Sequence, residues 1–109
     1  MQKQFKVYID DILDSIRKIE DYTNEMDYDS FIGNNLVVDA VIRNLEIIGE
    51  AVKNIPTEIR KKHPGIEWKK IAGLRDILIH AYSGVDLKII WDIIENKVPE
   101  LKDLVKEVS

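Results

Sequence analysis

The amino-acid sequence predicts an all-α protein, an antiparallel up-and-down bundle of four long helices with short helical pieces between them. Apolar residues recur at three- and four-residue intervals along most of the chain, which is the period of an amphipathic helix. No run shows the alternation of apolar and polar residues that is typical of a half-buried strand. A length of 109 residues, with 45% apolar and 33% charged residues, fits one soluble domain over residues 1–109.

The first two helices are expected over about residues 3–25 and from Asp29 or Phe31 to Asn54. The apolar stripe of the first consists of Phe5, Tyr8, Ile9, Ile12, Leu13, Ile16 and Ile19. The stripe of the second consists of Val37, Val41, Leu45, Ile48, Val52 and Ile55, and is widened by Leu36, Ala40, Ile47 and Ala51. Such a wide stripe predicts that the second helix packs on two sides and lies centrally. Pro56 ends it, because the residue before a proline avoids the α region.

The second half of the chain predicts a short helical turn over Pro56–His63 and two further helices. The third is expected from about Glu67 to Ala81. Asp86 is expected to cap the fourth, and Pro99 should kink or restart it. The fourth helix carries a near-heptad stripe of Leu87, Ile90, Trp91, Ile94, Val98, Leu101, Leu104, Val105 and Val108.

Composition excludes several classes of protein. The chain has no cysteine, and therefore no disulfide, thiol nucleophile or cysteine-based metal site. No apolar run is long enough to cross a membrane, so a cytoplasmic protein is expected. A net charge of −4 argues against a general nucleic-acid coat protein. DNA is not expected as a partner.

A local basic cluster nevertheless precedes the third predicted helix and extends into it. Residues 60–70 contain five bases and one acid; the bases are Arg60, Lys61, Lys62, Lys69 and Lys70. A local basic patch can bind phosphate on an acidic protein, since salt confines the effect of each charge to about 10 Å. Lys62, Lys69 and Lys70 are therefore candidate phosphate contacts, although a solvated helix end explains the same run.

The segment Arg75-Asp-Ile-Leu-Ile-His80-Ala-Tyr82 holds a cation, a proton-transfer group and a phenol within two helical turns. His80 is one of only two histidines in the chain, and histidine can gain and lose a proton near neutral pH. In a regular helix Tyr82 would lie about 20° from Arg75, and His80 about 140° away. A site formed within one helix is therefore strained, which favours a site at a helix end or between two subunits.

An arginine and a histidine, without a carboxylate cluster or metal ligands, suit the cleavage of RNA phosphodiesters. The planar fork of arginine matches phosphate oxygens and offsets charge in the transition state. Histidine can take a proton from the 2′-hydroxyl or give one to the leaving oxygen. Because the 2′-hydroxyl would be the nucleophile, the reaction would need no metal and no cofactor.

Structural explanations of the same residues stay open. A lone histidine near a helix C-terminus is often a capping or surface group. Arg75 could pair with Asp76 or with a carboxylate of the second helix. Tyr82 could be an aromatic residue at the edge of the core with a solvated hydroxyl.

The second helix carries its own charged series, Asp39, Arg43, Glu46 and Glu50. These residues could form only surface pairs. Gly49 stands beside them near the centre of a helix, where glycine costs about 1 kcal/mol relative to alanine. Close approach by another backbone would explain this glycine.

Three blocks of the chain resemble a known family. Arg75-x4-His80-x-Tyr82, preceded by Trp68-Lys-Lys-Ile-Ala-Gly-Leu, resembles the R-x4-H-x-Y signature of the HEPN superfamily. Arg43-Asn-Leu-Glu-Ile-Ile-Gly-Glu-Ala51 and the C-terminal Asp86-Leu…Trp91…Pro99-Glu-Leu101 are similar to its HepT-like branch. The similarity covers nearly the whole chain.

This resemblance implies a homodimer in which two motifs face one cleft, and a metal-independent ribonuclease that acts as a toxin. It also implies an MNT-type minimal nucleotidyltransferase as antitoxin, which adenylylates the motif tyrosine. Carried over by position, Arg75 and His80 are catalytic and Tyr82 is the modification site. Asp76 takes the polar position after the arginine. Asp76, Glu50 and Arg43 are expected as supporting residues.

A different class of function fits the same motif. The chain could be a non-catalytic helical subunit whose motif binds a nucleotide or docks the transferase, or a plain dimerisation module. The presence of both Arg75 and His80 favours the enzyme, because a docking surface has no need of a titrating group.

Overall fold

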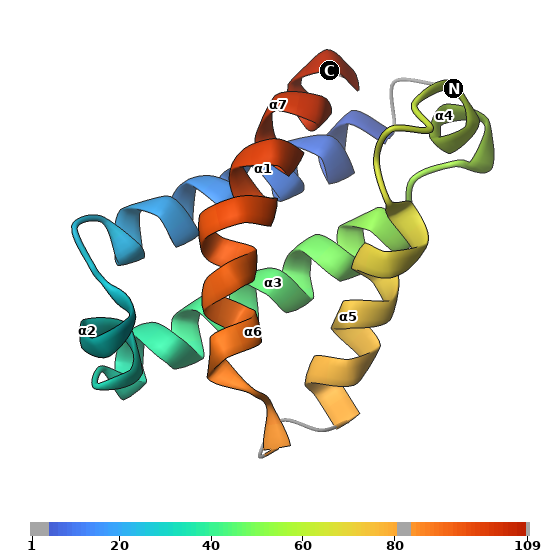
Figure 1. Ribbon diagram of the computed structural model, residues 1–109. Helices are drawn as coiled ribbons and strands as arrows, with labels where there is room; N and C mark the ends of the chain where they lie inside the picture. Colours follow the sequence, from blue (N-terminus) through green and yellow to red (C-terminus); the bar gives the residue numbers. More distant parts are fainter. Residues whose placement is uncertain (1–4, 81–83, 109) are drawn as a thin grey trace.

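Helices make up nearly all of the structure, a computed structural model that describes residues 5–80 and 84–108 (Figure 1). They are α1 (Lys6–Thr23), α2 (Tyr28–Ile32), α3 (Asn35–Lys53), α4 (Thr57–Lys62), α5 (Trp68–His80), α6 (Leu87–Asp92), a π-helical segment (Ile93–Lys97) and α7 (Val98–Val108). The described residues contain no strand. The prediction of an all-α fold is confirmed, and the end predicted for the third helix, Ala81, lies outside the described residues.

Helix α3 is the centre of the fold, as its wide apolar stripe predicts. It packs along α1 on one flank and along α5 on the other, while the arm formed by α6, the π-helical segment and α7 crosses over α1 and α3 (Figure 1). The side chains of Val41, Leu45, Ile48 and Val52 are buried within this arrangement. The two flanks and the crossing arm account for burial around most of the circumference of α3.

The predicted start of the second helix is wrong. The chain forms α2, breaks at Gly33 and Asn34, and begins α3 only at Asn35. The break follows from a capping residue. Asn34 Oδ1 accepts a hydrogen bond from the Val37 amide at 3.1 Å, and this bond satisfies one of the free amide groups at the start of α3. Local turn chemistry therefore overrides the apolar period in this segment.

Helix α2 has its own capping box and a buried anchor. Asp27 Oδ1 accepts from the Ser30 amide at 2.8 Å, and Ser30 Oγ accepts from the Asp27 amide at 3.0 Å. These bonds lower the pKa of Asp27 below its usual range. The fully buried Phe31 packs with its ring centroid 5.2 Å from that of Trp91, so that α2 fastens the start of α3 to α6.

The arm from α6 to α7 begins and restarts where the sequence predicts. Asp86 Oδ1 accepts from the Lys88 amide at 2.9 Å and caps α6. The chain then widens into the π-helical segment, and α-helix resumes at Val98, directly before Pro99. Proline lacks an amide hydrogen and its ring clashes with the carbonyl four residues earlier, so a π-turn in front of it relieves that clash.

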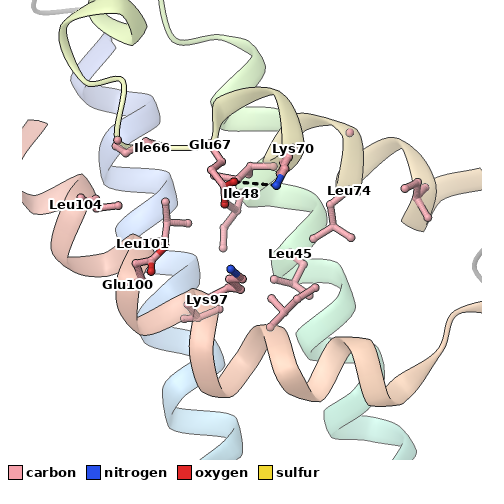
Figure 2. A pocket seen from close by; sticks show the side chains of 16 residues that line it. Leu45, Ile48, Ile66, Glu67, Lys70, Leu74, Lys97, Glu100, Leu101 and Leu104 are labelled. Carbon is pink, nitrogen blue, oxygen red and sulfur yellow. Dashed lines mark ion pairs between the residues drawn. The ribbon is translucent and has the colours of Figure 1, made fainter.

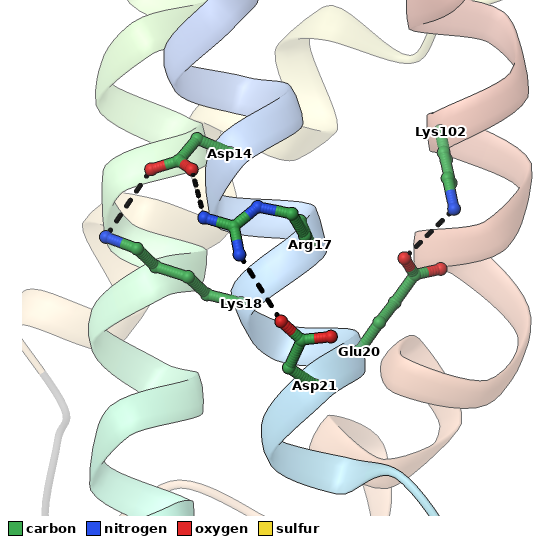
Figure 3. A network of polar contacts seen from close by, with 6 residues as sticks. All are labelled: Asp14, Arg17, Lys18, Glu20, Asp21 and Lys102. Atoms are coloured by element: carbon green, nitrogen blue, oxygen red, sulfur yellow. Dashed lines mark hydrogen bonds and ion pairs between the residues drawn. The ribbon is translucent and has the colours of Figure 1, made fainter.

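One ion pair joins α7 to α1 across the bundle. Lys102 Nζ lies 3.0 Å from Glu20 Oε1, and both side chains are a little more than one-third exposed (Figure 3). The remaining charges of this network lie within α1, where Arg17 bridges Asp14 at 2.6 Å and Asp21 at 3.3 Å. Exposed pairs of this kind contribute about 0–1 kcal/mol each, so packing rather than charge holds the arm in place.

Candidate active site

Helix α5 meets α3 at Gly49, where the two helices come unusually close. A Cβ atom on Gly49 would overlap the Cβ of Arg75 and would lie 3.1 Å from the carbonyl oxygen of Ile71. The prediction that another backbone approaches this glycine is confirmed. The missing side chain allows the base of the Arg75 side chain to rest directly on α3.

Arg75 is held by two carboxylates. Its Nη2 lies 3.0 Å from Glu50 Oε2 on α3, and its Nη1 lies 3.2 Å from Asp76 Oδ1 on its own helix. Its Nε is buried and has no hydrogen-bond acceptor among the described residues. The guanidinium therefore presents only its terminal nitrogens, and the pairing with Asp76 or a carboxylate of the second helix, which the sequence left open, occurs with both.

Asp76 also receives a second cation. Lys53 Nζ, at the end of α3, lies 2.6 Å from the same Oδ1 atom that contacts Arg75. The hydrogen bond from Lys53, followed by that from Arg75, lowers the pKa of Asp76 below its usual range. Lys53 was not predicted as part of the site, because nothing in the spacing of residues 53 and 76 indicates that they meet.

A cavity of about 180 Å³ opens beside Arg75, with α3 as its floor and α1 and α5 as its walls. We call it the Arg75 cavity; its lining is Tyr8, Asp11, Arg43, Glu46, Ile47, Glu50, Ala51, Asn54, Arg75 and Ile79. Arg43 Nη1 lies 3.5 Å from Glu46 Oε1 within it. Arg43 is largely exposed and Glu46 mostly buried. Of the three predicted supporting residues, Glu50 and Arg43 line this cavity with Arg75, and Asp76 does not.

His80 lies apart from this cavity. It is exposed and is the last described residue of α5, which is α-helical from Trp68 to His80. A regular helix places His80 about 140° around the axis from Arg75. His80 is not among the residues that line the Arg75 cavity. Tyr82, the predicted modification site, lies outside the described residues.

The basic cluster divides into structural and exposed members. Arg60 donates from Nε to the Ile55 carbonyl at 3.1 Å and from Nη2 to the Val52 carbonyl at 2.8 Å, so it caps the end of α3. Lys61 and Lys62 on α4 and Lys69 and Lys70 on α5 are exposed. Lys70 Nζ pairs with Glu67 at 2.9 Å, and this bond lowers the pKa of Glu67.

A larger cavity lies on the other side of α5 and was not predicted. Figure 2 shows it between α5, α3 and the arm of α6–α7, lined mainly by aliphatic side chains together with the charged Glu67, Lys70, Lys97 and Glu100. Its volume is about 480 Å³, and Leu45, Ile48, Leu74 and Leu101 are among its lining residues. Helix α5 therefore packs closely on α3 but leaves an apolar groove toward α7.

The described residues contain no group of three or more histidine, aspartate or glutamate side chains placed to hold a metal ion. No helix within the described part of the chain is long and apolar enough to span a membrane.

Comparison with known proteins identifies relatives that are about 45% identical to this chain. "Probable ribonuclease HepT" of Thermococcus cleftensis is 44% identical over 102 residues, which cover 94% of this chain and 93% of that protein. "Putative RNase MJ0127" of Methanocaldococcus jannaschii is 44% identical over 112 residues, which cover 99% of this chain and 93% of that protein. "Gamma-glutamylcyclotransferase and putative RNase MJ0434" of the same organism is 45% identical over 108 residues. The chain spans 49% of this third relative.

No solved structure matches the chain. A sequence model of one family, described as "Ribonuclease HepT-like", matches residues 12–108 and so includes Gly49, Arg75 and His80. This match and the relatives above confirm the family, and with it the class of enzyme, that the three sequence blocks predict. The chain belongs to the HepT-like family of ribonucleases.

Proposed function

We propose that this protein is a metal-independent ribonuclease toxin of a HEPN/MNT pair, active in the cytoplasm as a homodimer. The observation that carries the proposal is the placement of Arg75 and His80 on one regular helix. Arg75 is turned toward α3, and His80 is exposed about 140° away. One subunit thus offers a phosphate-binding group and a proton-transfer group that face different ways, and two facing subunits can pair them.

The chemistry follows from the groups themselves. The fork of Arg75 holds the scissile phosphate and offsets the negative charge that builds up on it. One His80 removes the proton of the 2′-hydroxyl, whose oxygen attacks phosphorus. The second His80, from the other subunit, gives a proton to the departing 5′-oxygen. The products are a 2′,3′-cyclic phosphate and a free 5′-hydroxyl.

Exposed residues beside the Arg75 cavity support a partner subunit on this face. Ile79 lines the cavity and is 43% exposed, and Leu36 on α3 is 79% exposed. Leu36 lies seven residues before Arg43 and therefore on the same side of α3. The RNA strand would reach the cleft along the exposed Lys62, Lys69 and Lys70, which offer phosphate contacts without base specificity.

RNA cleavage is expected to proceed at an unchanged rate in EDTA, because the internal 2′-hydroxyl supplies the nucleophile. The test is incubation of the unmodified protein with total RNA, with and without EDTA, and analysis of the fragment ends. Activity that disappears with EDTA and returns with Mg²⁺ or Mn²⁺ would contradict the metal-independent mechanism.

The proposed control is adenylylation of Tyr82 by an MNT-type nucleotidyltransferase encoded as the antitoxin. An adenylyl group adds a negative phosphodiester two residues after His80, and this charge would compete with RNA for Arg75. The Tyr82→Phe variant should therefore stay toxic when the transferase is co-expressed. Wild-type protein should be silenced and gain the mass of one or more adenylyl groups. Equal silencing of both proteins would show that complex formation, not modification, is the mechanism.

A second candidate is a non-catalytic subunit that docks the transferase. The observation in its favour is the pairing of both terminal nitrogens of Arg75 with Glu50 and Asp76, which is also how a purely structural arginine is held. Absence of RNA cleavage by unmodified protein, together with stable binding of the transferase, would favour this candidate.

A further inference from the structure

The contact between Arg75 and Asp76 is not explained by their own helix. Neighbouring residues of an α-helix project about 100° apart and do not face each other. Arg75 Nη1 nevertheless lies 3.2 Å from Asp76 Oδ1. The spacing along the helix alone therefore does not fix the Asp76 carboxylate against the guanidinium.

Lys53 holds the Asp76 carboxylate from α3. Its ammonium group lies 2.6 Å from Asp76 Oδ1, the same oxygen that accepts from Arg75. Lys53 follows Glu50 by three residues, so both project from the last turns of α3 toward α5. The four side chains form a series of alternating charge: Glu50, Arg75, Asp76 and Lys53.

We propose that Lys53 is a positioning residue for the ribonuclease reaction, which fixes the Arg75 guanidinium by anchoring Asp76. This inference rests on the function proposed above. Lys53 is not required to touch RNA, and it acts on the reaction only through the orientation of Arg75.

The two ends of the Arg75 fork then have different tasks. Nη1 is fixed, because Asp76 is itself held by Lys53, whose side chain is 36% exposed. Nη2 is paired with Glu50, whose side chain is 54% exposed and has no second cation within 4 Å among the described residues. The Nη2 end can exchange the Glu50 carboxylate for an RNA phosphate while Nη1 keeps the guanidinium in place.

The test compares Lys53→Met with Lys53→Arg, and uses Lys102→Met as the matched control. Lys102 has the same exposed fraction of 36% and also pairs with a carboxylate of another helix, but lies far along the chain on α7 (Figure 3). The first readout is the pKa of Asp76, measured by carbon NMR of its carboxyl group. In Lys53→Met this pKa should rise toward the ordinary value of about 3.9, and in Lys102→Met it should not change.

The second readout is steady-state cleavage of a short RNA. Lys53→Met should lower kcat by about 10- to 100-fold with little change in KM, since a small displacement of a catalytic group acts on the chemical step. Lys53→Arg should keep most of the wild-type rate, because the guanidinium of the new arginine can also bind the Asp76 carboxylate. In an Asp76→Asn background, Lys53→Met should have no further effect.

Each other outcome overturns the positioning role. An unchanged Asp76 pKa in Lys53→Met would show that Lys53 does not anchor this carboxylate. A large rise in KM with unchanged kcat would make Lys53 a direct RNA contact. Loss of rate in Lys53→Met that persists in the Asp76→Asn background would exclude action through Asp76. If wild-type protein cleaves no RNA while the pKa shift is observed, the proposed ribonuclease activity fails and its positioning residue fails with it.

Discussion

Replacement of His80 with alanine is expected to lower RNA cleavage by about 10²- to 10⁴-fold, the usual contribution of a proton-transfer group. The fold should be unaffected, because His80 is exposed at the last described position of α5 and the core cluster does not include it. Cleavage of a short RNA gives the rate, and circular dichroism gives the helix content. The two measurements separate loss of chemistry from loss of structure.

The matched control is His63→Ala, the same substitution at the other histidine. His63 caps the end of α4, and its backbone carbonyl accepts the Trp68 indole N–H at 3.0 Å, a bond that survives removal of the imidazole. His63→Ala should therefore retain its activity. Full activity of His80→Ala would contradict a catalytic role and would show that His80 is only a surface residue near a helix end.

Replacement of Gly49 with alanine is expected to destabilise the protein, against the intrinsic preference of helices for alanine. Alanine in a helix interior normally stabilises by about 1 kcal/mol relative to glycine. At Gly49 the added Cβ would overlap the Cβ of Arg75, and overpacking of this kind costs about 1–3 kcal/mol. We expect the free energy of unfolding in urea to fall by roughly 1–2 kcal/mol. Cleavage should fall more than about tenfold, because α5 must move away with Arg75.

Gly73 provides the control on α5 itself. A Cβ at Gly73 meets no atom within 4 Å, since it projects toward the apolar groove. Gly73→Ala should therefore raise the free energy of unfolding by up to about 1 kcal/mol. An equal rise in Gly49→Ala would contradict the close approach of α5 to α3 described here.

Much of the fold was predictable, because apolar periodicity and capping residues act locally. The wide stripe of α3 predicted its central position, and Asp86 and Pro99 marked the start and the restart of the last arm. The break before Asn35 was missed, although Asp27 and Asn34 are strong capping residues. Apolar residues stand on both sides of the break, up to Ile32 and again from Leu36, and the expected helix was drawn across Gly33 and Asn34 on that basis.

The sequence predicted the candidate site as a set of residues, whose catalytic roles stay predictions, but not as a geometry. The motif pointed to Arg75 and His80. Gly49 indicated that another backbone packs closely against its helix, but not which one. Which carboxylates hold Arg75 depends on how α5 lies against α3, and a sequence does not contain that relation. Lys53 shows this limit most clearly, because its partner Asp76 lies 23 positions away along the chain.

The apolar groove on one side of α5 has a consequence for how the protein loses activity. Helix α5 carries Arg75 and His80, yet it packs mainly on α3 and leaves about 480 Å³ open toward α7. Local unfolding of α5 therefore breaks one helix interface, whereas global unfolding breaks them all, so the local event requires less free energy. We therefore expect that α5, which carries the proposed catalytic residues Arg75 and His80, can open locally while α1, α3 and α7 stay folded.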